Sequence, residues 1–165
     1  MQRRTALIWP MGLLLAGCGF KLRQAPDFAF DSAFINGLNN SPLVIELRRN
    51  LEATDRVEVV QDPRQMERAQ VIIDLLSDQR EKVVVALNAS GQVRQFQLRV
   101  RLRFKLRTLQ GKELIAPTEI LQQRDINYSE TLALAKETEE ALLYKSMQTD
   151  VVQQLMRRLA AVREL

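Results

Sequence analysis

Five cationic side chains alternate with apolar ones in the segment QFQLRVRLRFKLR, residues 95–107. Because strand side chains alternate between two faces, these cations would share one face over about 27 Å, at about 3.3 Å per residue. Guanidinium groups match phosphate oxygens, so one interpretation is a groove for a phosphorylated ligand. The other is a solvated sheet face that neighbouring strands neutralise. The five cations are Arg99, Arg101, Arg103, Lys105 and Arg107.

Acidic residues on the flanking segments favour the solvated face. Cross-strand ion pairs of this kind contribute about 0.2–1 kcal/mol each, yet they neutralise much of a charged row. The expected registers of the two hairpins give four such pairs. They are Asp74 with Arg107, Asp78 with Arg103, Glu113 with Arg107, and Glu119 with Arg101 or, after a shift of two residues, with Arg103.

Two cations of the row stay poorly neutralised in these registers. We expect Arg99 and Lys105 to be the least covered, and Arg80 and Lys82 of the adjacent strand to add charge near Arg99. Arg99 and Lys105 are therefore candidate contacts for an anionic ligand. Nucleic acid is a poor candidate for that ligand, because the chain has few aromatic side chains on which bases would stack.

The only cysteine, Cys18, follows a segment with the parts of a secretory signal. Arg3 and Arg4 precede an apolar stretch over residues 6–15, and small residues follow it. The stretch is too short to span a bilayer, which needs about 20 apolar residues. A buried N-terminal helix is the alternative, but Pro10 and Gly12 would weaken it.

Residues 15–18, Leu-Ala-Gly-Cys, resemble the lipobox of bacterial lipoproteins, in which cleavage leaves an acylated cysteine as the first residue. Acyl chains anchor a protein at about 0.8 kcal/mol per buried methylene. Gly19, rather than aspartate, follows the cysteine, which by the bacterial sorting rule implies the outer membrane. We therefore expect a signal peptide over 1–17, an acylated tether over 18–27 and a single domain over 28–165.

The composition excludes most kinds of enzyme. The chain has no histidine and no cysteine besides Cys18, which removes most nucleophile and zinc sites. Asp74 and Asp78 are expected on one strand face, about 13 Å apart, too far for a glycosidase pair. We predict a non-enzymatic protein with no metal and no cofactor other than the covalent lipid on Cys18.

Hydrophobic periodicity and turn residues define the elements. A long C-terminal helix over 131–162 should turn an apolar stripe toward the core, comprising Leu132, Ala135, Leu142, Met147, Val151, Leu155, Leu159 and Val162. A shorter helix over 42–54 begins at Pro42 after an N-cap at Ser41. Strands are expected over 28–35, 56–60, 69–88, 93–109 and 113–126. Helices covering one face of a sheet make an α+β fold.

Two segments resemble one family, the lipopolysaccharide-assembly lipoprotein (LptE) family of Gram-negative bacteria. CGFKLR, residues 18–23, is similar to that family's start of the mature chain. Residues 127–159 are similar to its C-terminal segment: an Ala-Lys motif at Lys136, then Glu139, Met147 and a basic pair before Leu159. The order and length of the intervening strands also fit, so the resemblance covers nearly all of the mature chain.

The resemblance implies two helices packed on one face of a four-stranded, mostly antiparallel sheet. It also implies a periplasmic-side, lipid-anchored protein inside the lumen of the lipopolysaccharide-assembly β-barrel (LptD). Family members assist assembly of that barrel and bind lipopolysaccharide for delivery to the outer leaflet. Lys136 matches a family lysine, whereas the family's basic position before Gly91 is uncharged here. Arg94 is the candidate substitute.

Alternatives remain at two levels. Lys136 is followed one turn later by Glu140, so the lysine has an ordinary i,i+4 pairing as well as a ligand-binding interpretation. For the whole chain, the alternative is a structural scaffold lipoprotein of another envelope machine, such as the β-barrel insertion complex. The binding hypothesis assigns lipopolysaccharide contacts to Lys136, Arg94, Arg99 and Lys105.

Overall fold

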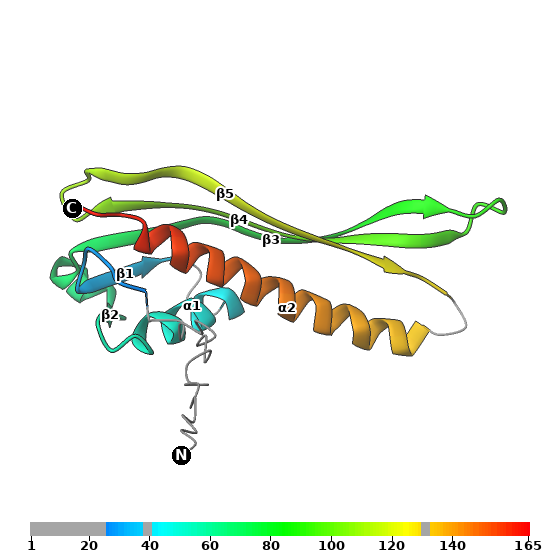
Figure 1. Cartoon of the computed structure of the whole chain (residues 1–165), viewed down its shortest axis with the longest axis horizontal. Helices are drawn as coiled ribbons and strands as arrows, with labels where there is room; N and C mark the ends of the chain where they lie inside the picture. The colour runs from blue at the N-terminus through cyan, green and yellow to red at the C-terminus, as the bar shows by residue number, and fades with distance from the viewer. Residues whose placement is uncertain (1–25, 38–40, 130–132) are drawn as a thin grey trace, which may run out of the picture.

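The computed structural model describes residues 26–37, 41–129 and 133–165 (Figure 1). Cys18, the lipobox and Leu132 lie outside the described residues. All the predicted helices and strands are present with shifted ends, and the largest shift moves the start of the first strand to Ser32. In chain order the elements are β1 (Ser32–Asn36), α1 (Pro42–Glu52), β2 (Glu58–Val60), the 3₁₀ helix η1 (Pro63–Arg68), β3 (Val71–Leu87), β4 (Val93–Thr108), β5 (Glu113–Asn127) and α2 (Ala133–Ala160).

One mixed sheet contains every strand, in the order β2-β1-β3-β4-β5. β1 is parallel to β2 and β3, and the long strands β3, β4 and β5 are antiparallel. The predicted α+β class is confirmed. The sheet has five strands rather than four, because the three-residue β2 adds an edge beside β1.

Both helices cover the same face of the sheet, and α2 runs along the long strands (Figure 1). The main core lies between these layers, where Leu47 of α1, Leu102 of β4 and Leu155 of α2 are fully buried. The N-cap of α1 is as predicted: Leu43 N donates to Ser41 Oγ at 3.3 Å, and Pro42 begins the helix. On the opposite face, a small second cluster of Phe34, Val60, Ala69 and Ile72 packs with Met66 of η1.

The apolar stripe of α2 is correctly predicted only in its second half. Met147, Val151, Leu155 and Leu159 are buried, whereas Leu142 is 63% exposed and Ala135 is also exposed. Leu142 precedes Met147 by five residues. At about 100° per residue its side chain points about 140° away from that of Met147 around the helix axis, and so away from the core. Tyr144, Glu140 and Lys136 instead continue the sheet-facing stripe, and all three are half-buried. Val162, beyond the helix, is partly buried against the core.

Irregularities in the two hairpins set which side chains share a face. In β3 the pairing shifts between Leu75 and Ser77, so Asp78 lies opposite Leu102 and not opposite Arg103 as predicted. Asp78 therefore faces the helices, where its carboxylate accepts a hydrogen bond from Ser41 Oγ at 2.7 Å. Asp74 and Asp78 lie on opposite faces of the sheet, which corrects the expectation that they share one.

The second hairpin contains both of the registers considered for it. Near its turn Arg107 lies opposite Glu113, and beyond a second irregularity Arg103 lies opposite Glu119. The shift falls between Phe104 and Arg107, where β5 contains Pro117. Proline cannot donate to a ladder and is confined to edges and bulges, which agrees with its place on an edge strand.

Candidate functional site

The four predicted ligand-binding cations divide between the two faces of the sheet. Lys136 and Arg94 lie where the first turns of α2 approach the beginning of β4 and the end of β5. They line the same hollow. Arg99 and Lys105 point to the other face, because the alternate residues of β4, such as Leu98 and Leu106, are buried under the helices. The structure therefore provides two separate cationic surfaces.

Three adjoining hollows between α2 and the sheet share lining residues, and we call them together the basic groove. The hollow with Arg94 has a volume of about 330 Å³, and it shares Asn127, Tyr128 and Lys136 with a cavity of about 150 Å³. That cavity shares Lys82, Glu137 and Glu140 with a more open hollow of about 500 Å³. The cations that line the groove are Arg80, Lys82, Arg94 and Lys136.

Aromatic side chains hold the sheet side of the groove. The rings of Phe96 and Tyr128 meet edge-to-face with centroids 5.3 Å apart, an arrangement that aromatic pairs prefer. Tyr128 N donates to the carbonyl of Arg94 at 2.9 Å, which joins the end of β5 to the beginning of β4. The guanidinium of Arg94 itself is exposed and has no ion pair among the described residues. A phosphate would therefore not have to displace a carboxylate from it.

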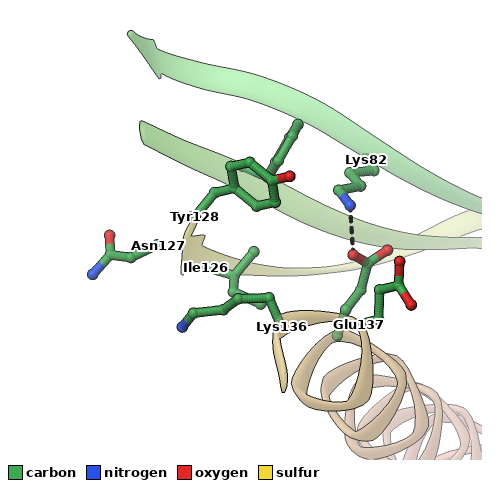
Figure 2. A pocket seen from close by; sticks show the side chains of 8 residues that line it. Lys82, Ile126, Asn127, Tyr128, Lys136 and Glu137 are labelled. Atoms are coloured by element: carbon green, nitrogen blue, oxygen red, sulfur yellow. Dashed lines mark hydrogen bonds and ion pairs between the residues drawn. The ribbon is translucent and has the colours of Figure 1, made fainter. Parts of the chain in front are cut away.

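Lys136 is half-buried, with 23% of its side chain exposed, and its partner differs from the predicted one. Its ammonium lies 2.7 Å from Glu139 Oε2, three residues on, and not beside Glu140. Figure 2 shows its Nζ pointing to the side of Asn127, away from Lys82. Lys136 therefore lies between the Arg94 hollow and the cavity that contains Lys82.

Arg80 and Lys82 were expected on the face of the sheet that carries Arg99, and that expectation is wrong. The shift in β3 after Leu75 turns both toward the helices, opposite Val100 and Leu98. Lys82 Nζ lies 2.6 Å from Glu140 Oε2, the pair marked by the dashed line in Figure 2. The same Nζ lies 4.4 Å from the centroid of the Phe96 ring. The sequence carries no local signal for this shift, so strict alternation along β3 misplaced both side chains.

Arg80 and Tyr144 close the far end of the groove. Arg80 donates to Gln148 of α2 and lies over the Tyr144 ring, 5.8 Å from its centroid. The Tyr144 hydroxyl donates to the Glu81 carbonyl at 2.8 Å. Burial raises the pKa of Tyr144, and the negative charge of Glu140 raises it further. Tyr144 is therefore a neutral hydrogen-bond donor at physiological pH.

The open face of the sheet carries an ion-paired network in place of a row of free cations. Its pairs are Arg99–Glu81 at 3.9 Å, Arg101–Glu119 at 3.5 Å, Lys105–Asp74 at 3.7 Å and Arg107–Asp74 at 2.7 Å. The expectation that Arg99 and Lys105 are the least covered is thus wrong. Within the described part of the chain, Arg103 is the cation of the row that has no ion pair.

Asp74 anchors this network. Its buried carboxylate accepts hydrogen bonds from Asn36 Nδ2 at 2.6 Å and from Arg107 Nε at 2.7 Å. Burial by itself would raise the pKa of Asp74. The hydrogen bonds from Arg107 and Asn36, with the charges of Arg107 and Lys105, outweigh burial and hold the pKa below its ordinary value.

The described residues contain no candidate metal site and no helix that could span a membrane. Among residues 26–37, 41–129 and 133–165, no three His, Cys, Asp or Glu side chains are grouped as metal ligands. In the same ranges, no helix combines the length and the apolar character that crossing a membrane requires. The chemistry that the basic groove can perform is the binding of anionic groups.

Comparison with known families decides the relationship. The model of the LptE family, described as lipopolysaccharide-assembly, matches residues 30–159. This match includes all the strands, α1 and all but the last residue of α2. The chain belongs to the LptE family.

Relatives of known sequence and structure agree with this assignment. A lipopolysaccharide-assembly lipoprotein LptE from Pectobacterium atrosepticum is 27% identical over 157 residues, covering 91% of this chain and 80% of the relative. The solution structure of lipoprotein B from Nitrosomonas europaea is 34% identical, covers 87% of this chain and 91% of its own, and has a TM-score of 0.74. Rare lipoprotein B from Shewanella oneidensis has the same fold at 21% identity, with a TM-score of 0.65 and coverage of 79% and 94%.

Membership in the LptE family confirms several of the predictions from sequence. The chain is a lipopolysaccharide-assembly lipoprotein of the Gram-negative outer membrane, and it is not an enzyme. The lipidation of Cys18 stays a prediction, because that residue lies outside the described part of the chain.

Proposed function

We propose that this LptE-family protein binds lipopolysaccharide in the basic groove, with Lys136 and Arg94 contacting its phosphates. The observation that carries the proposal is that these two cations, one from the C-terminal helix and one from β4, line the same hollow. Arg94 supplies a planar fork that matches phosphate oxygens, and Lys136 supplies a compact point charge. Partial burial of Lys136 strengthens its attraction for an anion, because nearby water screens it less.

The proposed mechanism is charge compensation. Lipopolysaccharide molecules carry phosphates on lipid A and core, and those phosphates hold aggregates together through shared counter-ions. Cations in the groove would replace the counter-ions of one molecule and so separate it from its neighbours. The protein would thereby present single molecules for delivery to the outer leaflet.

We also propose that the protein plugs the lumen of the LptD barrel and assists its assembly, held at the periplasmic side by acyl chains on Cys18. Family membership and the lipobox support this placement. The ion-paired open face supports it as well, because the interior of an outer-membrane barrel is polar. Such a face can meet a wet, charged wall without burying an unpaired ion.

A pull-down of the acylated full-length protein from cross-linked envelopes tests the partner. The expected result is capture of LptD, and loss of LptD levels when the protein is depleted. Capture of the β-barrel insertion complex without LptD would favour the alternative, a structural scaffold of that machine.

Lipopolysaccharide binding is tested with the double variant Lys136→Gln and Arg94→Gln. Each substitution removes a charge-assisted contact, so we expect the affinity for lipopolysaccharide to fall about tenfold or more. Wild-type protein should also prefer lipopolysaccharide over the same material treated with phosphatase. Equal binding of both forms, or an unchanged affinity of the double variant, would contradict the proposal.

The predicted contacts at Arg99 and Lys105 are tested separately by Arg99→Glu combined with Lys105→Glu. Both cations are already paired with carboxylates, at 3.9 and 3.7 Å. If they contact lipopolysaccharide, the charge reversal weakens binding while the fold persists. Unchanged binding would assign this face to solvent or to the barrel wall.

A further inference from the structure

Lys82 occupies a place in the basic groove that its position in the sequence did not suggest. It lines both the 150 Å³ cavity and the open 500 Å³ hollow, and its ammonium lies against the Phe96 ring. Its side chain is 36% exposed, so the ammonium remains within reach of a ligand. Figure 2 shows Lys82 extending from the sheet toward the helix that carries Lys136.

The two lysines of the cavity are each held by a carboxylate of α2, and the two carboxylates are adjacent in sequence. Glu139 pairs with Lys136 at 2.7 Å, and Glu140 pairs with Lys82 at 2.6 Å. A third acid, Glu137, lines the same cavity and makes no ion pair within the described residues. The charge of the groove is therefore largely neutralised by acidic side chains of α2.

These pairs can be exchanged for a stronger anion. A lysine ammonium has three donors, and one carboxylate oxygen close to it leaves two of them for other acceptors. A phosphate group offers three strong acceptor oxygens and up to two charges, more than a carboxylate provides. The side chain of Glu139 is 48% exposed, so water can solvate it once it is released.

The size of the cavity limits what enters it. At about 150 Å³ it is smaller than the 300–1,000 Å³ of typical small-molecule sites. It can admit one phosphate-sized headgroup, while acyl chains and further sugars stay outside. This suits a ligand that presents separate phosphates on a bulky body.

We propose that Lys82 is a further phosphate-binding residue of the groove, and that Glu139 and Glu140 are built-in counter-anions that a phosphate must displace from Lys136 and Lys82. The inference rests on the proposed binding of lipopolysaccharide. It adds a basis for selectivity: phosphate monoesters, with up to two charges, displace the carboxylates, whereas the singly charged diesters of ordinary phospholipids do so poorly.

Opposite effects of substitutions on the two sides of one ion pair test this inference. In the acylated full-length protein, Glu140→Gln should raise affinity for lipopolysaccharide about two- to fivefold, because the competing anion is gone. Lys82→Gln should lower the affinity by a similar factor. If the pair merely holds α2 in place, both variants lose affinity, and the inference is overturned.

Glu137→Gln is the matched control. It changes the charge of the groove by the same unit without releasing a lysine, so its gain should be clearly smaller than that of Glu140→Gln. An equal gain would reduce the effect to general repulsion and overturn the displacement step. A short-chain, water-soluble phosphatidylglycerol, which offers no bilayer to the acyl anchor, gives the selectivity arm. The variant Glu139→Gln combined with Glu140→Gln should bind this phosphodiester more tightly than wild type does.

Failure of the proposed function is distinguishable from failure of this inference. If wild-type protein does not discriminate phosphorylated from phosphatase-treated lipopolysaccharide, both the proposed function and this inference are wrong. If it does, and the variant of Lys136 and Arg94 loses affinity while Lys82→Gln and Glu140→Gln change nothing, only the displacement device is wrong. Thermal unfolding of each variant checks that the fold is intact.

Discussion

At the scale of single residues, Asp74 shows how one carboxylate organises a charged surface. It is buried near the start of β3. Its carboxylate accepts hydrogen bonds from Arg107 of β4 and Asn36 of β1 and forms an ion pair with Lys105 of β4. Three strands are thereby joined by one side chain. Removing the carboxylate would leave two cations on that face without their partner.

Asp74→Asn should lower the free energy of unfolding by about 1–3 kcal/mol at neutral pH, since hydrogen bonds to charged groups carry that weight. The folded pKa of Asp74 lies below the ordinary value of 3.8, so this contribution is complete above that pH. It is lost as the pH falls from there through the folded pKa. Denaturant unfolding at several pH values should show a constant difference above about pH 5 and a shrinking one below about pH 4.

A difference between wild type and Asp74→Asn that stays constant down to pH 2 would mean that the ion pairs do not stabilise the fold. Arg103→Gln serves as a control, because Arg103 has no ion pair in the described part of the chain and should change stability little.

Prediction from sequence succeeded at this scale where a residue type restricts the backbone, and failed where a register had to be counted. Ser41 and Pro42 were correctly identified as a helix start from local chemistry alone. Lys82 was placed on the wrong face, because one irregularity after Leu75 inverts the residues of β3 from Ser77 to Val84. No residue type at that point requires an irregularity.

At the scale of elements, the second half of α2 packs in the core and its first half lines the basic groove. Residues 147–159 bury a continuous apolar stripe, whereas the first turns present half-buried charged side chains to the groove. The helical periodicity of apolar residues predicted the first half poorly, since Leu142 and Ala135 are exposed. Polar residues carry the sheet-facing positions there, and a hydrophobic pattern cannot detect them.

A matched pair of substitutions tests this division. Leu155→Ala should lower the free energy of unfolding by about 2–5 kcal/mol, because Leu155 is fully buried. Leu142→Ala removes the same atoms from an exposed position and should change stability by less than about 0.5 kcal/mol. Equal losses in denaturant unfolding would place Leu142 in the core and contradict the helix register.

At the scale of the whole molecule, the core and the groove lie toward opposite ends of the sheet. The β3–β4 hairpin extends beyond the start of α2 (Figure 1), and Val84, Val85 and Leu87 near its tip are 44–59% exposed. Farther along, Val100, Leu102 and Phe104 are fully buried under the helices. One end of these strands is therefore covered by the helices, and the other end is largely exposed.

Hydrogen exchange should reveal this gradient. Local opening requires free energies from near zero up to the global value, depending on how much packing is lost. Amides of residues 93–96 should exchange much faster than those of residues 100–106, although all belong to β4. Exchange measured by NMR or mass spectrometry with equal protection along β4 would contradict the gradient.

Separation of core and groove has a consequence for how this family can diverge. Substitutions around the groove alter ligand chemistry while leaving the buried stripe of α2 and the central strands untouched. The two parts can therefore change at different rates. Ala89 and Ser90 in the turn of the β3–β4 hairpin and Arg94 just beyond it are all exposed, so a cation can change its position along this hairpin at little cost to folding.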